Sequence, residues 1–278
     1  MAHSEFIATP PSGRGNKPMS VASLLRSVDA PSPDDLPGPY SEIAFCEAHG
    51  AYMISTVDEH HVRRARPAYC ARCERQRQLE KKLARAAFPA RFREASFRNY
   101  DVTCEGEADA LAAAREYAQP FKATLRDGRN LLLLGSNGTG KTRLACSVAR
   151  EVIAQGYTAL YITVRDFLGM VSSVWDQKSM TEEALFATLT EPDLLILDEV
   201  GPTRSSEHER VLLNDLIDRR SRELKPMIVA GNVKVRELRD RIGERALDRL
   251  REGGSKAIQF RWGSRRTSRK HDSEQFSI

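Results

Sequence analysis

Apolar residues occur in short runs over the second half of the chain, and glycine, proline or charged residues bound most of these runs. Runs of this length are typical of strands that are buried on both faces of a sheet. We therefore predict strands at residues 131–134, 159–164, 193–200, 226–232 and 256–262.

Between these runs, apolar residues follow helical spacing, so strands alternate with helices and an α/β fold with a parallel sheet flanked by helices is expected. Asp166 is expected to cap the helix that starts at Phe167. Val211, Leu212, Ile217 and Leu224 are expected on or near one face of their helix. The predicted helices are 74–87, 107–119, one that opens after residue 142, 167–175, 207–224 and 235–250.

A glycine-rich loop follows the strand at 131–134 and fits the pattern G-x-x-x-x-G-K-[ST] at every fixed position. Glycines let backbone N–H groups turn toward an anion, and the start of a helix adds partial positive charge. Lys141 can reach the β- and γ-phosphates of ATP, and the Thr142 hydroxyl can bind Mg²⁺. A chance glycine-rich turn is the alternative, but the strand before and the helix after argue against it. The predicted phosphate loop is Gly135, Ser136, Asn137, Gly138, Thr139, Gly140, Lys141 and Thr142.

Two acids end the strand at 193–200, where ligands collect in open α/β sheets. Asp198 is expected to hold the Mg²⁺ shell and Glu199 to polarise the attacking water. An apolar run followed by Asp-Glu is weakly specific alone, but this one lies 56 residues after Thr142 with a strand between. Two acids that only cap the following loop are the alternative.

Several polar or aromatic residues have two interpretations each. Asn232 follows a strand and would orient the water or contact the γ-phosphate, or it would only cap the turn. An arginine among Arg245, Arg249 and Arg251 would neutralise phosphate charge in a neighbouring subunit's site, or all three lie on a solvated helix face. Trp175 would stack on a base, or it is buried against the core.

Four residues near the N-terminus have the spacing of a structural zinc site. Cys46 and His49 form one close pair, and Cys70 and Cys73 form another after an intervening loop. Four protein ligands leave no open position, so the metal would stabilise a small module and not catalyse. Ordinary cysteines with a surface histidine are the alternative, and His60 or His61 could replace His49.

The composition along the chain suggests how it divides into domains. Residues 1–40 are rich in Pro, Gly and Ser and are expected to be disordered. The number of cysteines is odd and two of them form a C-x-x-C, which indicates a reducing, cytoplasmic location. No apolar run is long enough to cross a membrane. The interleaved aromatic and basic residues at 91–100 favour docking of a linker on the core over nucleic-acid stacking. The plan is a disordered segment at 1–40, a zinc module at 41–75, a helical linker at 76–105, an ATPase domain at 106–266 and a basic or polar tail at 267–278.

With both nucleotide motifs in view, the chain resembles the DnaC/DnaI-type replicative helicase loaders, which are AAA+ ATPases related to the IstB-like transposition helpers. A zinc pattern before the ATPase is similar to that of DnaI-like and phage-type members. The resemblance covers roughly residues 90–266, and it rests on the segments 135–142, 194–201, 217–221, 242–250 and 260–266.

This resemblance implies a role for each site residue. Asp198 and Glu199 match the Walker B pair, and Arg249 matches an arginine finger given to a neighbouring subunit. Arg266 matches the sensor-2 arginine. Asn232 matches sensor 1, although Ala230 and Gly231 precede it where Thr or Ser is usual. The implied catalytic set is Lys141, Glu199, Asn232, Arg249 and Arg266.

The resemblance implies an ATP-dependent loader that places a hexameric replicative helicase on single-stranded DNA and self-associates through its ATPase domain. Trp175 and residues 204–210 are where DNA contacts are expected. A transposition-helper ATPase is a second hypothesis, which the zinc pattern disfavours. A zinc-tethered adaptor that uses nucleotide as a switch without useful hydrolysis is a third, and intact Glu199 and Thr142 speak against it.

Overall fold

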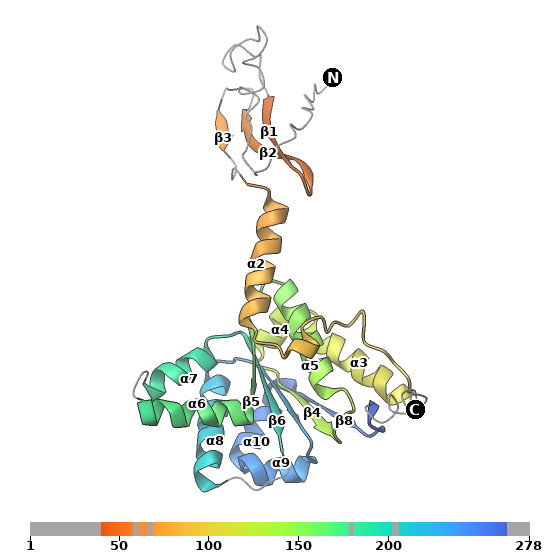
Figure 1. The fold of residues 1–278 in the computed structure, drawn as a ribbon, viewed down its shortest axis with the longest axis vertical. Coiled ribbons are helices and arrows are strands. Elements are labelled where there is room, and N and C mark those ends of the chain that lie inside the picture. Colours follow the sequence, from red (N-terminus) through yellow and green to blue (C-terminus); the bar gives the residue numbers. More distant parts are fainter. Residues whose placement is uncertain are drawn as a thin grey trace, which may run out of the picture. The chain divides into compact units, whose positions relative to one another are not determined.

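The computed structural model describes residues 40–57, 60, 62–65, 69–177, 181–201 and 206–265 (Figure 1). The chain divides into two compact units, an N-terminal unit of residues 1–80 and a C-terminal unit of residues 81–278. Residues 1–39 of the segment that was expected to be disordered, Arg266 and the tail at 267–278 lie outside the described residues. No helix among those ranges is long and apolar enough to cross a membrane.

The N-terminal unit contains a small antiparallel sheet that the sequence analysis did not anticipate. Its order is β1-β2-β3, with β1 at Tyr40–Cys46, β2 at Gly50–Val57 and β3 at Arg63–Ala65. A tight turn joins β1 to β2, and Gly50 starts β2 with a φ of 76°, a conformation that glycine adopts freely. The helix α2, Ala71–Arg85, begins three residues before the predicted start at Glu74.

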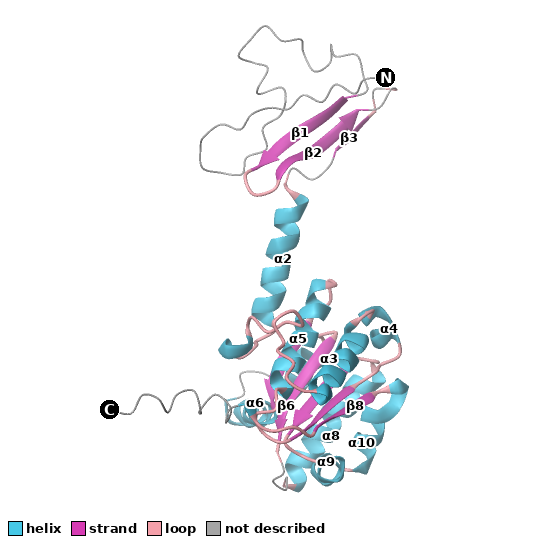
Figure 2. Cartoon of the chain, turned by 90° about the vertical axis from the view of Figure 1, so that its right-hand side faces the viewer, coloured by secondary structure: helices cyan, strands magenta, loops and turns pink. Residues whose placement is uncertain are grey.

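The C-terminal unit is built on a five-stranded sheet of order β5-β6-β7-β4-β8, in which every neighbouring pair is parallel. Figure 2 shows its strands in magenta among the helices of this unit. This confirms the predicted α/β fold. The strands are β4 at Leu131–Gly135, β5 at Ala159–Thr163, β6 at Leu194–Val200, β7 at Met227–Gly231 and β8 at Lys256–Phe260.

Helices cover the sheet, and alternate strand residues face opposite layers. Leu132 and Leu134 belong to one large core with apolar residues from α6 through α10, whereas the helices α3 and α5 pack together. The helices are α3 at Glu105–Ala118, α4 at Phe121–Arg126, α5 at Lys141–Ala154, α6 at Val164–Gln177, α7 at Glu182–Thr190, α8 at Glu207–Arg222, α9 at Val235–Ile242 and α10 at Glu244–Arg251.

Two helix predictions were wrong in detail. The single helix expected at 235–250 is broken at Gly243, whose φ of 87° ends α9 and starts α10. Asp166 does not cap α6; Thr163 does, because its hydroxyl accepts the Asp166 N–H at 3.0 Å. In both cases a local feature, the backbone conformation of Gly243 or the capping hydroxyl of Thr163, sets the helix end and the hydrophobic pattern does not.

The helix α8 also differs from its predicted face. Leu212 and Ile217 are buried, but Val211 and Leu224 are exposed. Leu224 lies beyond the last helical residue and has a φ of 49°, so its side chain does not continue the helical stripe.

Candidate nucleotide site and candidate metal centre

The phosphate loop connects β4 to α5 in the order that the sequence predicted. Gly140, with a φ of 99°, precedes the first helical residue, Lys141. Gly135 has a φ of 142°, and a Cβ there would stand 2.3 Å from the Phe260 carbonyl oxygen, so only glycine fits against β8. The backbone at the start of α5 therefore has the shape that binds an anion through N–H groups.

Lys141 is nearly buried within this loop. Its ammonium group donates to the carbonyl oxygens of Gly135 at 2.7 Å and Ser136 at 2.6 Å. These contacts fold the side chain back over the loop and place one positive charge beside the glycine backbone.

Asp198 is brought to the loop from β6, 56 residues away in the sequence. Its Oδ2 accepts hydrogen bonds from the Thr142 hydroxyl at 2.7 Å and from the Tyr161 hydroxyl at 2.9 Å. The side chain is 3% exposed. A hydroxyl and a carboxylate side by side are hard oxygen donors, which is the chemistry that Mg²⁺ takes in nucleotide sites, so the residues present fit this ion.

Glu199 lies on a bulge of β6. Between Leu197 and Val200, β6 uses one more residue than β7 does, and Glu199 has a φ of 60°. Its carboxylate is exposed while the residues on either side of it are buried. A non-glycine residue held in this conformation costs on the order of 1–3 kcal/mol, and bulges of this kind re-aim a side chain.

Asn232 directly follows β7, so it stands at the same edge of the sheet as the ends of β4 and β6, and it is half-buried. This position agrees with either of its two interpretations.

The last described segment of the chain returns to the phosphate loop. The Trp262 ring N–H donates to the Thr139 carbonyl at 3.0 Å, and the Arg265 backbone N–H donates to the Gly138 carbonyl at 3.0 Å. The Arg265 side chain forms an ion pair with Glu107 at 2.6 Å. Arg266 is the next residue in the sequence and lies outside the described residues.

Glu107 is almost completely buried beneath this segment. Burial favours the neutral acid, but hydrogen bonds from Arg265 and Thr103 outweigh it and lower the pKa of Glu107 to about 2. Glu107 and Arg265 thereby fix the chain on the phosphate loop directly before residue 266.

Arg249 lies at the opposite end of the sheet. Its backbone carbonyl accepts from the Asn130 amide at 3.4 Å, and Asn130 directly precedes β4. A five-residue strand is about 13 Å long, so β4 separates this carbonyl from the loop that holds Lys141. The Arg249 guanidinium forms an ion pair with Asp218 of α8.

The segment 91–100 docks on the core, which confirms the favoured interpretation. Arg143 donates to the Asn99 carbonyl, and Arg115 donates to the Phe97 carbonyl at 3.2 Å. Tyr100 is buried with its hydroxyl close to Gly140.

Trp175 is 45% exposed, so burial against the core is wrong. Its ring N–H donates to Glu182 at 3.0 Å, and its ring lies 4.8 Å from that of His208 on α8. The other predicted DNA-contact segment is 204–210, and its first two residues, 204 and 205, lie outside the described residues.

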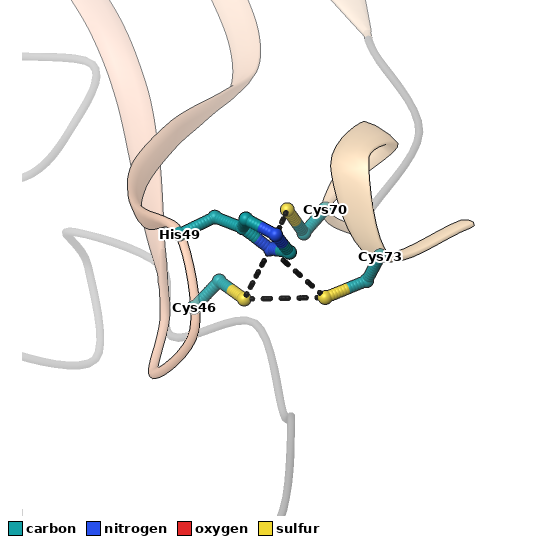
Figure 3. A group of neighbouring side chains, drawn as sticks. All are labelled: Cys46, His49, Cys70 and Cys73. Carbon is teal, nitrogen blue, oxygen red and sulfur yellow. Dashed lines mark hydrogen bonds between the residues drawn. The ribbon is translucent and has the colours of Figure 1, made fainter. Parts of the chain in front are cut away.

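The four predicted zinc ligands form one cluster in the N-terminal unit (Figure 3). Cys46 ends β1, His49 lies in the turn before β2, Cys70 precedes α2 and Cys73 is in its first turn. The Cys46 and Cys73 sulfurs are 3.4 Å apart, and the His49 Nδ1 lies 3.3–3.7 Å from the three sulfurs.

These spacings match a tetrahedral site, since Zn–S and Zn–N bonds of about 2.3 and 2.0 Å separate the donors by roughly 3.5–3.8 Å. Contact with the Cys46 thiol, followed by desolvation, raises the pKa of Cys73 to about 11, whereas hydrogen bonding to the Cys73 backbone lowers the pKa of Cys70. The donor set can hold one metal ion, and His60 is not part of it.

Sequence reasoning missed Tyr161, Glu107, Arg265 and Asp218. Asp218 and Arg265 lie in the segments 217–221 and 260–266 that carry the resemblance, but each of the four acquires its partner from a distant part of the chain. Only the fold could have revealed them.

The fold and these contacts define a P-loop nucleotide-binding protein with a separate Cys/His cluster. The sequence matches the family of IstB-like ATP binding proteins over residues 69–270. It is 33% identical over 202 residues to the replicative helicase loader DnaC of Escherichia coli (strain K12), which covers 73% of this chain and 81% of the relative. The chain therefore belongs to the IstB-like ATP binding protein family, with DnaC-type relatives.

Solved structures share the fold. The crystal structure of the DnaC helicase loader is similar with a TM-score of 0.56 and 22% identity, over 62% of this chain and 100% of the other. The crystal structure of DnaI is similar with a TM-score of 0.54 and 20% identity, over 62% of this chain and 94% of the other.

Proposed function

We propose that this protein is an ATP-dependent loader of a replicative DNA helicase. The single observation that carries the chemistry is the meeting of Thr142 and Asp198 at 2.7 Å beside the phosphate loop. The relatives' printed names, replicative helicase loader, support the biological role. A cytoplasmic location stays a prediction from the cysteine content.

In this proposal ATP binds along residues 135–142. Lys141 turns from the loop carbonyls to the β- and γ-phosphates. Thr142 and Asp198 would hold Mg²⁺, which would neutralise the charge that develops on the phosphates. Glu199 orients water for attack on the γ-phosphorus, the bond to the β–γ bridging oxygen breaks, and ADP and phosphate leave. Asn232 assists in orienting the water.

Arg249 completes the site of a neighbouring copy. Its place near the start of β4 supports this role, because Lys141 of the same copy lies past the other end of that strand. Arg266 acts as the residue that senses the γ-phosphate. Turnover would then require self-association through the ATPase domain, residues 106–266.

The zinc module, residues 41–75, grips the hexameric helicase, and residues 76–105 link it to the ATPase domain. Single-stranded DNA is expected near Trp175 and residues 204–210. The exposure of Trp175 supports stacking on a base.

Co-purification tests the role directly. The full chain should capture the replicative helicase of its host, and a Cys70→Ser variant should capture less. Capture of a transposase instead of a helicase would favour the transposition-helper hypothesis.

Glu199→Gln tests the chemistry. The variant should bind ATP but release phosphate far more slowly, because the carboxylate that orients the water is gone. Unchanged phosphate release would favour the adaptor that uses nucleotide only as a switch.

A further inference from the structure

Tyr161 contacts two parts of the C-terminal unit through two different groups. Its side-chain hydroxyl donates to Asp198 Oδ2 at 2.9 Å. Its backbone N–H donates to the Ala86 carbonyl at 2.9 Å. The first contact reaches the candidate Mg²⁺ site, and the second reaches the chain that directly follows α2.

The strand position of Tyr161 explains both contacts. In the parallel register Tyr161 lies beside Ile196, so it shares a face of the sheet with Asp198, two residues further along β6. Because β5 is first in the strand order, its other edge is open to a pairing partner. Ala86 takes that place and is completely buried there.

A tyrosine hydroxyl is protonated at neutral pH and can donate to a carboxylate. Asp198 Oδ1 is already taken by the Glu199 N–H at 2.7 Å. Tyr161 therefore fixes a buried carboxylate whose Oδ2 accepts from both Tyr161 and Thr142.

We propose that Tyr161 is a positioning residue that orients Asp198 toward the cation of bound MgATP and joins that site to the linker at Ala86. The proposal rests on the proposed function, because it assumes that Asp198 and Thr142 hold Mg²⁺. Removal of a hydrogen-bond partner behind a metal ligand typically weakens metal affinity by about 10–100-fold.

The connection to the linker has a direct reporter. The amide proton of residue 161 exchanges with solvent only when its bond to Ala86 opens. MgATP that tightens Asp198 against Tyr161 should hold β5 in place and slow this exchange. α2, the helix before Ala86, carries Cys73 in its first turn, so the linker continues directly into the candidate metal centre.

The experiment compares the wild-type chain with Tyr161→Phe, which removes the hydroxyl and keeps the backbone N–H. ATP binding is measured against Mg²⁺ concentration, and exchange of the residue 161 amide is measured with ATP plus Mg²⁺ and with ATP plus a chelator. We expect the variant to need about tenfold more Mg²⁺ for half-maximal ATP binding. We also expect Mg²⁺ to slow the amide exchange in the wild type and not in the variant.

Tyr117→Phe is the matched control. It removes another buried tyrosine hydroxyl, which donates to the Arg129 carbonyl at 3.0 Å just before β4, and its Mg²⁺ requirement should equal that of the wild type. An unchanged requirement in Tyr161→Phe overturns the positioning role, and equal slowing of exchange in both chains overturns the link to Ala86. If the wild type binds no ATP at any Mg²⁺ concentration, the proposed function itself fails and this inference fails with it.

Discussion

The guanidinium of Arg249 forms an ion pair with the carboxylate of Asp218, so the predicted arginine finger is held within its own protomer. Arg222 contacts the same carboxylate, and Arg245 approaches it at 3.7 Å. Asp218 is 9% exposed, and three arginines therefore share one largely buried acid. An Arg249 that reaches a neighbouring site must first leave this acid.

Replacement of Asp218 should therefore ease assembly of the active site between copies. Because the Arg249 side chain is 21% exposed, solvent screens its ion pair, which contributes about 1 kcal/mol. Asp218→Asn should therefore lower the protein concentration for half-maximal ATPase activity about fivefold. Steady-state ATPase rates over a range of protein concentrations check this. Arg249→Ala should give low, concentration-independent rates with or without the Asp218 change. A lower rate for Asp218→Asn at every concentration would show instead that Asp218 positions the finger for its partner.

The sequence contained enough to predict the nucleotide site but not its supports. The phosphate loop and the Asp198–Glu199 pair are local patterns, in which a few adjacent residues carry the whole chemical signal. Asp218 lies in the segment 217–221 that carries the resemblance. Its role, like those of Glu107 and Tyr161, depends on a partner that is far away in the sequence, at separations of 31, 158 and 37 residues respectively. Only the fold brings those pairs together.

The same distinction holds for the elements. All five strands of the parallel sheet were predicted, and the apolar runs were clearest for β4, β6 and β7, which are buried along most of their length. The sheet of the N-terminal unit has a mixed polar pattern and a metal-ligand cluster at one end, so periodicity gave no clear sign of it. The break at Gly243 depends on one left-handed backbone conformation, which the helical spacing on both sides concealed.

The Glu107–Arg265 pair predicts a loss of stability in acid. The pKa of Glu107 lies below its ordinary value of about 4.5, so the folded state favours the charged form. The resulting stabilisation is fully present above that ordinary value and is lost as the pH falls through it toward 2. Chemical denaturation at several pH values gives the free energy of unfolding of the wild type and of Glu107→Gln. The difference between the two free energies should be present at neutral pH and should narrow in acid.

The neutral-pH difference should be about 2–3 kcal/mol, because the neutral amide of this variant would leave the Arg265 guanidinium without its acid in a largely buried site. Glu116→Gln is a suitable control, since Glu116 pairs with Lys256 in an exposed position. If the free energies of unfolding of Glu107→Gln and the wild type differed by the same amount at every pH, the Glu107–Arg265 pair would not be the source of the acid sensitivity.

Metal removal should affect the N-terminal unit first. The full chain is expected to bind one equivalent of Zn²⁺ through Cys46, His49, Cys70 and Cys73, and metal analysis of Cys73→Ser should show a large loss. Hydrogen exchange in β1 and β2 should speed up on chelation, because the metal joins the turn between them to the start of α2. ATP binding by the C-terminal unit should persist.

Cys104→Ser provides the control for this experiment, since Cys104 is an exposed free thiol outside the cluster. It should retain the metal. Metal affinity should also fall as the pH drops, because the thiols must lose their protons to bind. Retention of the full equivalent by Cys73→Ser would rule out the four-ligand site.

Substitution of Arg220 tests how α8 is held against the elements around it. It is completely buried, and its guanidinium donates to the carbonyl oxygens of Leu189, Pro192 and Pro226 at 2.7, 3.1 and 2.8 Å. Burial lowers its pKa to about 9, so it stays charged at neutral pH and holds the end of α7 and the starts of β6 and β7 together.

A lysine cannot reproduce this planar set of donors, so Arg220→Lys should lower the free energy of unfolding by about 3 kcal/mol or more. Thermal melting should show this as a fall of roughly 6–12 °C, whereas the exposed neighbour Arg222→Lys should change little. Equal melting shifts for the two variants would mean that the carbonyl contacts of Arg220 do not hold these elements.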